Sequence, residues 1–327
     1  MTQGAVDGSN DEFGRVDGSD SSNSFPRSYL APRQRGNPMS ELTLTTHTVG
    51  SGTATVTYDV RGDLAEATAD RPVLMLVGSP MDASGFGTLA SHFTDRPVVT
   101  YDPRGAGRNP TDATPISAEE HADDLHRVIQ DLAVGPVDLF ASSGGAVNAL
   151  ALVTAHPEDL RRVVAHEPPL AALLADRDAV LAVTRDMLAT YQSQGAGPAM
   201  AKFIPFVMYD GPVPETYLDQ PPADPAMFGM SSEDDGTRTD PLMRNIAGCV
   251  GYQPDLEALA AFGDRLVLAV GVESGQQMAA RGGRSVAEAL GRPATDFPSH
   301  HGGFLGGEHG QNGDPVGFAA ALRTVLD

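Results

Sequence analysis

Short apolar runs alternate along this chain with longer segments in which apolar residues recur every three or four positions. The run 72–80 is typical of a buried strand that ends in a Gly/Pro turn. The segment 117–133 has apolar residues at helical spacing and carboxylates near its start, where they suit a helix N-terminus. Because buried strands that alternate with amphipathic helices form βαβ units, this pattern predicts a parallel sheet with helices packed against it.

The same alternation continues through the rest of the chain. Further strands are predicted at 97–101, 137–141, 162–165, 265–271 and near 294–297, and further helices at 146–155, 276–290 and 315–326. The regular spacing of these elements favours one α/β domain with an insertion rather than two separate domains.

A pair of serines stands between the strand that ends at Ala141 and the helix that follows. The small-x-Ser-x-Gly spacing of a nucleophile elbow places Ser143 at the apex, with Ala141 and Gly145 as the small neighbours that such a crowded turn requires. The apex hydroxyl would point out of the sheet. The next N–H group, on Gly144, would lie at a helix N-terminus, where negative charge is stabilised. Ser143 is therefore predicted to be a nucleophile.

In the order and character of its motifs, the chain resembles the α/β-hydrolase superfamily from about residue 42 to its C-terminus. The resemblance rests on the turn Val77-Gly78-Ser79-Pro80, the turn Asp102-x-Arg104-Gly105-x-Gly107, the Ser143 elbow and the late pair His301-Gly302. It implies an eight-stranded, mostly parallel sheet with helices on both faces and a helical cap inserted after the sixth strand. Most members hydrolyse esters, amides, lactones or similar bonds.

Composition changes along the chain in a way that fits this organisation. Residues 1–40 are rich in Gly, Ser, Asp, Asn and Pro and are predicted to be a disordered tail. Residues 41–167 and 262–327 are predicted to form the hydrolase core, and 168–261 the helical cap. The cap holds six of the eleven methionines and several aromatic residues. Such residues suit an adaptable apolar pocket and favour a small to medium apolar substrate, although packing between small cap helices would use them too.

A serine hydroxyl is a weak nucleophile until a base removes its proton, and a third group must orient that base. The resemblance implies a histidine just before a small residue, after the last short strand; His301 matches this position, and His300 is its neighbour. The usual place for the acid is three residues beyond the strand-ending Gly271. Ser274 stands there, and the carboxylate of Glu273 comes one residue earlier.

The second candidate for the acid is Glu167, directly after the sixth strand. Some relatives, including certain haloalkane dehalogenases, carry their triad acid there. Both glutamates lie between Ser143 and His301 along the chain, so chain order does not decide between them. Glu273 is preferred because a glutamate side chain is one methylene longer than that of the usual aspartate and could cover the one-residue offset. Glu167 would otherwise be a buried carboxylate that orders the cap or binds substrate.

An oxyanion hole needs two backbone N–H donors. Gly144 is predicted to supply one and Ser79 the other, because Pro80 has no N–H. Val77 stands where the superfamily usually has a histidine, so this turn must be held differently.

These residues predict a serine hydrolase that cleaves a carboxylic ester or lactone through an acyl-enzyme. The alternative is a non-hydrolytic protein of the same fold, such as a cofactor-free lyase or cyclase, or a ligand-binding module. The offset of Glu273 and the missing histidine at Val77 are the two features that keep this alternative open, and the hydrolase is preferred. Serine at position 143 argues against dehalogenase and epoxide-hydrolase chemistry, for which relatives use an aspartate.

Composition narrows the classes of partner. The 327 residues carry 22 basic and 43 acidic side chains, a net charge of −21, which argues against nucleic acids and anionic membranes as partners. The single cysteine, Cys249, excludes an internal disulfide, and no signal-peptide or membrane-spanning pattern is present, so we expect a cytoplasmic protein. We expect a small-molecule substrate and no metal or organic cofactor, and a homodimer stays open.

Overall fold

The computed structural model describes residues 43–327, and the tail predicted at 1–40 lies outside them. The described residues contain an eight-stranded sheet with strand order β1-β2-β4-β3-β5-β6-β7-β8. At one edge, β1 (Leu44–Val49) pairs antiparallel with β2 (Val56–Arg61), and β2 pairs antiparallel with β4 (Val98–Asp102). All the other neighbouring strands are parallel.

The parallel part of the sheet confirms the predicted fold class. It adds to β4 the strands β3 (Leu74–Val77), β5 (Val137–Ser142), β6 (Leu160–His166), β7 (Leu266–Gly271) and β8 (Thr295–Phe297). Because these strands run the same way, the residues that follow them meet at one edge of the sheet, where α/β folds place their sites.

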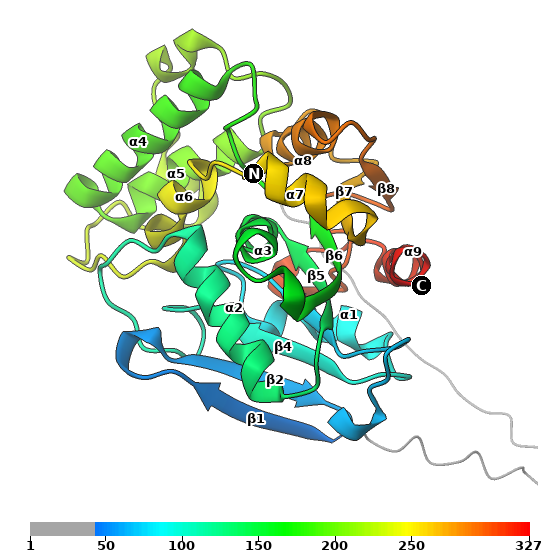
Figure 1. Ribbon diagram of the computed structural model, residues 1–327. Helices are drawn as coiled ribbons and strands as arrows, with labels where there is room; N and C mark the ends of the chain where they lie inside the picture. The colour runs from blue at the N-terminus through cyan, green and yellow to red at the C-terminus, as the bar shows by residue number, and fades with distance from the viewer. Residues whose placement is uncertain (1–42) are drawn as a thin grey trace, which may run out of the picture. The chain divides into compact units, whose positions relative to one another are not determined.

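Helices cover both faces of the sheet (Figure 1). One face carries α2 (Ala118–Leu132), α3 (Gly144–Ala155), α7 (Leu256–Phe262) and α8 (Met278–Ala289). The other carries α1 (Gly87–Ser91) and α9 (Pro315–Leu326).

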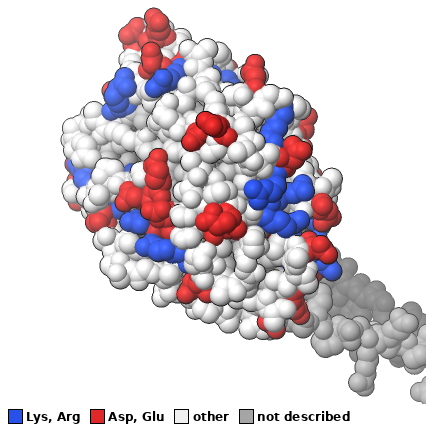
Figure 2. All heavy atoms as spheres, viewed as in Figure 1, with Lys and Arg blue, Asp and Glu red and all other residues white. Residues whose placement is uncertain are grey.

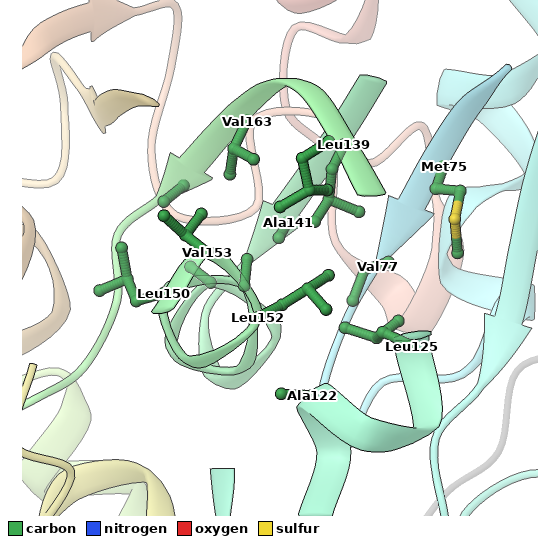
Figure 3. Close-up of a cluster of buried hydrophobic side chains, with 14 of the residues drawn as sticks. Met75, Val77, Ala122, Leu125, Leu139, Ala141, Leu150, Leu152, Val153 and Val163 are labelled. Atoms are coloured by element: carbon green, nitrogen blue, oxygen red, sulfur yellow. The ribbon is translucent and has the colours of Figure 1, made fainter. Parts of the chain in front are cut away.

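Alternation along the strands explains why both faces are covered. In β3, Met75 and Val77 belong to the core that contains α2 and α3, whereas Leu74 and Leu76 belong to the core that contains α1 and α9. Successive side chains of a strand point to opposite faces, so an uninterrupted apolar run needs a packing layer on each side. Figure 3 shows the first of these cores, with strand and helix side chains in contact.

The segment between β6 and β7, which we call the inserted segment (168–261), is largely helical. It contains α4 (Arg177–Gln194), α5 (Ala196–Val207), α6 (Pro241–Val250) and most of α7. Met187, Phe206 and Met243 pack together in its own core. These three side chains therefore pack within the segment, as the packing interpretation expected for them, whereas Met208 and Met227 are exposed. The assignment of this segment as a separate cap stays a prediction.

The distribution of charged side chains on the described surface can be compared with the classes of partner that the sequence predicts. Figure 2 shows acidic and basic side chains interspersed over the face viewed, rather than one sign alone. No helix within residues 43–327 is both long enough and apolar enough to cross a lipid bilayer.

Candidate active site

Ser143 occupies the turn between β5 and α3 in a backbone conformation that non-glycine residues rarely adopt. Its φ is 58° and its ψ is −128°, and α3 begins at the next residue, Gly144. The crowding expected of such a turn is present, because a Cβ atom added to Gly145 would lie 2.6 Å from the carbonyl oxygen of Val77. A strained serine held by close packing is a feature of nucleophile elbows.

The two adjacent serines have different surroundings. Ser142 is buried at the end of β5, and its hydroxyl is 3.0 Å from Nδ1 of His166. Ser143 is partly exposed, and its N–H donates a 3.0 Å hydrogen bond to the carbonyl of His166. The elbow is therefore tied to the end of β6, while the Ser143 side chain stays at the surface of the turn.

His301 and Glu167 form the close pair of this site. Nδ1 of His301 lies 2.6 Å from Oε2 of Glu167, and the other carboxylate oxygen, Oε1, accepts a 2.8 Å hydrogen bond from the N–H of Gly271. The Glu167 side chain is 1 % exposed and that of His301 is 38 % exposed. A buried carboxylate with both oxygens engaged fixes the imidazole while leaving part of the ring open to a ligand.

The surroundings of Glu167 keep its carboxyl group ionised. Burial alone would raise the pKa, but the hydrogen bond with His301 and the charge of the neighbouring imidazoles outweigh it and lower the pKa from 4.5 to about 2. The hydroxyl of Ser274 acts in the same direction, although it lies outside hydrogen-bond geometry. The carboxylate is therefore negative at neutral pH and stabilises positive charge on His301.

Within residues 43–327, the side chains of the other sequence candidates, Glu273 and His300, make no hydrogen bond with this pair. The Glu273 carboxylate accepts a hydrogen bond from the hydroxyl of Ser299 at 3.5 Å, a long contact in an exposed loop. The geometry thus reverses the preference for Glu273, because the short bond to His301 comes from Glu167. His300 turns toward its own loop, where Nε2 is 3.3 Å from the carbonyl of Asn312. Of the two adjacent histidines, His301 is the one with a carboxylate partner.

The strand register explains where Glu167 lies relative to Ser143. Ser142 and His166 are paired across β5 and β6, so Ser143 and Glu167 are the first residues beyond two adjacent strands. His301, after β8, reaches the same edge through its bond to Glu167. Among residues 43–327, no hydrogen bond joins Ser143 Oγ to His301. Such catalytic bonds often tighten only in the substrate complex.

Two backbone N–H groups beside Ser143 have no acceptor in the part of the chain that the structure describes. The turn after β3 lies against the start of α3, since a Cβ at Gly144 would overlap the carbonyl oxygen of Ser79. Neither the N–H of Ser79 nor that of Gly144 donates to an acceptor within residues 43–327. Ser79 is 7 % exposed and Gly144 is buried. Unpaired N–H donors in a turn that is largely shielded from water are suited to bind an anion.

One residue of the site, His166, was not singled out by the sequence. It is fully buried, its ring centroid lies 6.0 Å from that of His301, and its Nε2 atom has no hydrogen-bond partner within the described residues. Burial lowers the pKa of His166 from 6.5 to about 4, so the ring is neutral at neutral pH. The sequence feature that could have pointed to His166 is its position directly before Glu167.

Comparison with known proteins agrees with this architecture. A family model described as the alpha/beta hydrolase fold matches residues 71–214. The "Uncharacterized hydrolase YraK" of Bacillus subtilis (strain 168) is 36 % identical over 136 residues, which are 39 % of this chain and 48 % of that protein. The match thus spans about half the length of this curated relative.

Solved structures share the fold at low sequence identity. A thermophilic esterase from Thermogutta terrifontis superposes with a TM-score of 0.59 and 16 % identity, covering 87 % of this chain and 100 % of that one. The enol-lactonase from Burkholderia xenovorans LB400 gives a TM-score of 0.56 at 16 % identity, covering 83 % and 96 %. The sheet, the turn at Ser143 and the family match together show that the chain has the α/β-hydrolase fold, as the sequence resemblance predicted.

Proposed function

We propose that the protein is a serine hydrolase that cleaves a carboxylic ester or lactone of a small to medium apolar substrate through an acyl-enzyme. Ser143 is the nucleophile, His301 the general base, and Glu167 the residue that orients His301. The observation that carries the proposal is the short bond between His301 and the buried, ionised Glu167 at the edge of the sheet where Ser143 lies.

The first half-reaction forms the acyl-enzyme. Ser143 Oγ attacks the substrate carbonyl carbon while its proton passes to Nε2 of His301, and Glu167 stabilises the imidazolium through Nδ1. The carbonyl oxygen becomes an oxyanion that accepts hydrogen bonds from the N–H groups of Ser79 and Gly144. When the intermediate collapses, the carbon–oxygen bond to the alcohol breaks, and the leaving oxygen takes the proton from His301.

The second half-reaction returns the enzyme to its starting state. Water attacks the acyl carbon as His301 takes one of its protons, and the same two N–H groups stabilise the second oxyanion. The bond to Ser143 Oγ breaks, Oγ recovers the proton from His301, and the carboxylic acid leaves. In a lactone the alcohol and acid are parts of one molecule, so the product is a hydroxy acid.

The choice of ester or lactone rests on the chemistry of the site. An oxyanion hole and an activated serine act on an acyl carbon, and an alkoxide leaving group needs only the proton that His301 holds. Proteins of this fold named as an esterase and as an enol-lactonase are compatible with this chemistry.

Hydrolysis of p-nitrophenyl acetate and butyrate tests the proposal, with the wild type, Ser143→Ala and Ser142→Ala compared side by side. The adjacent serine is a matched control because its hydroxyl is buried against His166. Turnover should vanish in Ser143→Ala and persist in Ser142→Ala, with both variants folded by circular dichroism. Turnover that survives in Ser143→Ala would overturn the mechanism, and a folded wild type without turnover on a wider panel of esters and lactones would favour the non-hydrolytic alternative.

A further inference from the structure

A second group of titratable side chains lies at the opposite edge of the sheet from Ser143. His126 is on α2, His156 follows the last residue of α3, and Asp159 ends the short helix η4 (Pro157–Asp159) that leads into β6. One ligand atom from each of the three lies within 4.8 Å of the others. The seven residues of β6 separate this group from the elbow by about 20 Å.

The charge around Asp159 is unusual for this protein. The Asp159 side chain is 3 % exposed, and its partners are Nδ1 of His126 at 2.6 Å and the amide of Gln130 at 2.8 Å. Within residues 43–327, no arginine or lysine forms an ion pair with it. The buried aspartates elsewhere are paired with arginines, as Asp138 is with Arg161 at 2.6 Å. A buried carboxylate is costly unless a cation offsets its charge.

Two more carboxylates face the same group. Asp123 Oδ1 is 3.8 Å from Nε2 of His156, and Glu158 Oε1 is 3.7 Å from Nδ1 of the same ring. Both carboxylate side chains are mostly exposed, and neither has an arginine or lysine partner in the described part of the chain. Within residues 43–327, three carboxylates therefore surround two imidazoles, and no arginine or lysine forms an ion pair with any of the three.

We propose that His126, His156 and Asp159 bind a divalent transition-metal ion of the Zn²⁺ type. Imidazole nitrogen and carboxylate oxygen are the donors that zinc prefers after thiolate, whereas Mg²⁺ and Ca²⁺ require mainly oxygen donors. Water or the exposed carboxylate of Asp123 completes a four-coordinate shell. The ion bridges α2 to the connection between α3 and β6, so its role is structural.

The side chains can reach coordination distance with small movements. Donor atoms in a tetrahedral zinc site lie about 3.4 Å apart. This spacing falls between the present 2.6 Å from His126 Nδ1 to Asp159 Oδ2 and the 4.8 Å limit within which the three ligand atoms lie. The rings of His126 and His156 are stacked 3.8 Å apart with planes 11° from parallel, and both are partly exposed. Rotation of these rings turns their nitrogens toward one point above Asp159. The buried carboxylate stays in place as the anchor of the site.

Isothermal titration of the untagged, metal-free full chain with ZnCl₂ tests the proposal. The wild type should take up one Zn²⁺ per chain, and Zn²⁺ but not Mg²⁺ should raise the thermal unfolding midpoint. His126→Gln or His156→Gln should lower the association constant at least about tenfold, and the double variant should lose uptake. His92→Gln, a histidine outside the group, is the matched control and should bind as the wild type does.

Two results would overturn the proposal. If the double variant takes up Zn²⁺ and gains stability as the wild type does, the ion binds elsewhere. If the folded wild type takes up none, His126 alone balances Asp159 as an imidazole–carboxylate pair. Both histidines are partly exposed, so the single variants should fold, and ester hydrolysis and circular dichroism of the metal-free proteins report this separately from binding.

Discussion

Nδ1 of His301 lies 2.6 Å from Oε2 of Glu167, which is the first residue beyond β6. The carboxylate partner of His301 thus follows β6, the strand next to the one that precedes Ser143, rather than lying in the loop after β7. In that loop, the position usual for the acid holds Ser274, which is buried and whose hydroxyl has no hydrogen-bond partner among the described residues. The histidine–carboxylate pair is therefore present, but its carboxylate follows β6 instead of β7.

Glu167→Gln should reduce kcat for ester hydrolysis by about 10³–10⁴-fold, because an amide cannot stabilise the imidazolium or hold the required tautomer. KM should change little, since Glu167 is buried behind His301. Steady-state kinetics on p-nitrophenyl butyrate measure the effect.

Glu273→Gln is the matched control for that substitution, because it makes the same chemical change in an exposed loop. Its kcat should stay within about threefold of the wild-type value. A larger loss in Glu273→Gln than in Glu167→Gln would move the acid back to the loop after β7.

His166 should make folding stability depend on pH in the acid range. Burial holds its pKa in the folded protein at about 4, below the ordinary value of 6.5. Above pH 6.5 the ring is neutral in both states, so the stability is fully present. Between pH 6.5 and 4 only the unfolded state gains the proton, and the free energy of unfolding should fall by about 3 kcal/mol from this residue.

Urea denaturation at pH 7 and pH 4.5 checks this expectation with wild type, His166→Gln and His92→Gln. The His166→Gln variant should lose less stability on acidification than the wild type, and the His92→Gln control should follow the wild type. Equal losses in all three proteins would show that other groups account for the acid sensitivity.

The elbow should not tolerate a side chain at Gly145. A Cβ atom there would lie 2.6 Å from the Val77 carbonyl oxygen and 2.9 Å from Cα of Gly78, so backbone would have to move. Gly145→Ala should lower the free energy of unfolding by about 1–3 kcal/mol and reduce turnover, since the same strand end carries Ser79. Gly87→Ala in α1 has helical backbone angles and a nearest neighbour at 3.7 Å, and it should be neutral in both denaturation and kinetic assays.

Most of the sheet was predictable because its strands are buried on both faces. The apolar run predicted at 137–141 is β5 (Val137–Ser142), and the helix predicted at 117–133 is α2 (Ala118–Leu132). β1 could not be recognised in the same way, because five of its six residues are exposed and its register comes from pairing with β2. Local hydrophobic patterns predict elements that face the core. They do not predict an exposed edge strand whose position depends on pairing with a neighbouring strand.

The site was predictable where a local motif exists. The small residues around Ser143 and the glycine after His301 indicate tight turns. Such turns can be predicted from residues that are close together in the sequence. The choice between Glu167 and Glu273 depends on side-chain direction at the ends of two strands, which spacing alone does not give. The grouping of His126 with His156 and Asp159 depends in turn on how α2 packs beside α3.

The central claim is that Ser143 is an activated nucleophile, and covalent labelling tests it most directly. The wild type and Ser143→Ala would be treated with a fluorophosphonate probe, and the modified peptide mapped by mass spectrometry. We expect the probe on Ser143 in the wild type, no label in Ser143→Ala, and much slower labelling in Glu167→Gln. A folded wild type that stays unlabelled, or one labelled at another serine, would contradict the account.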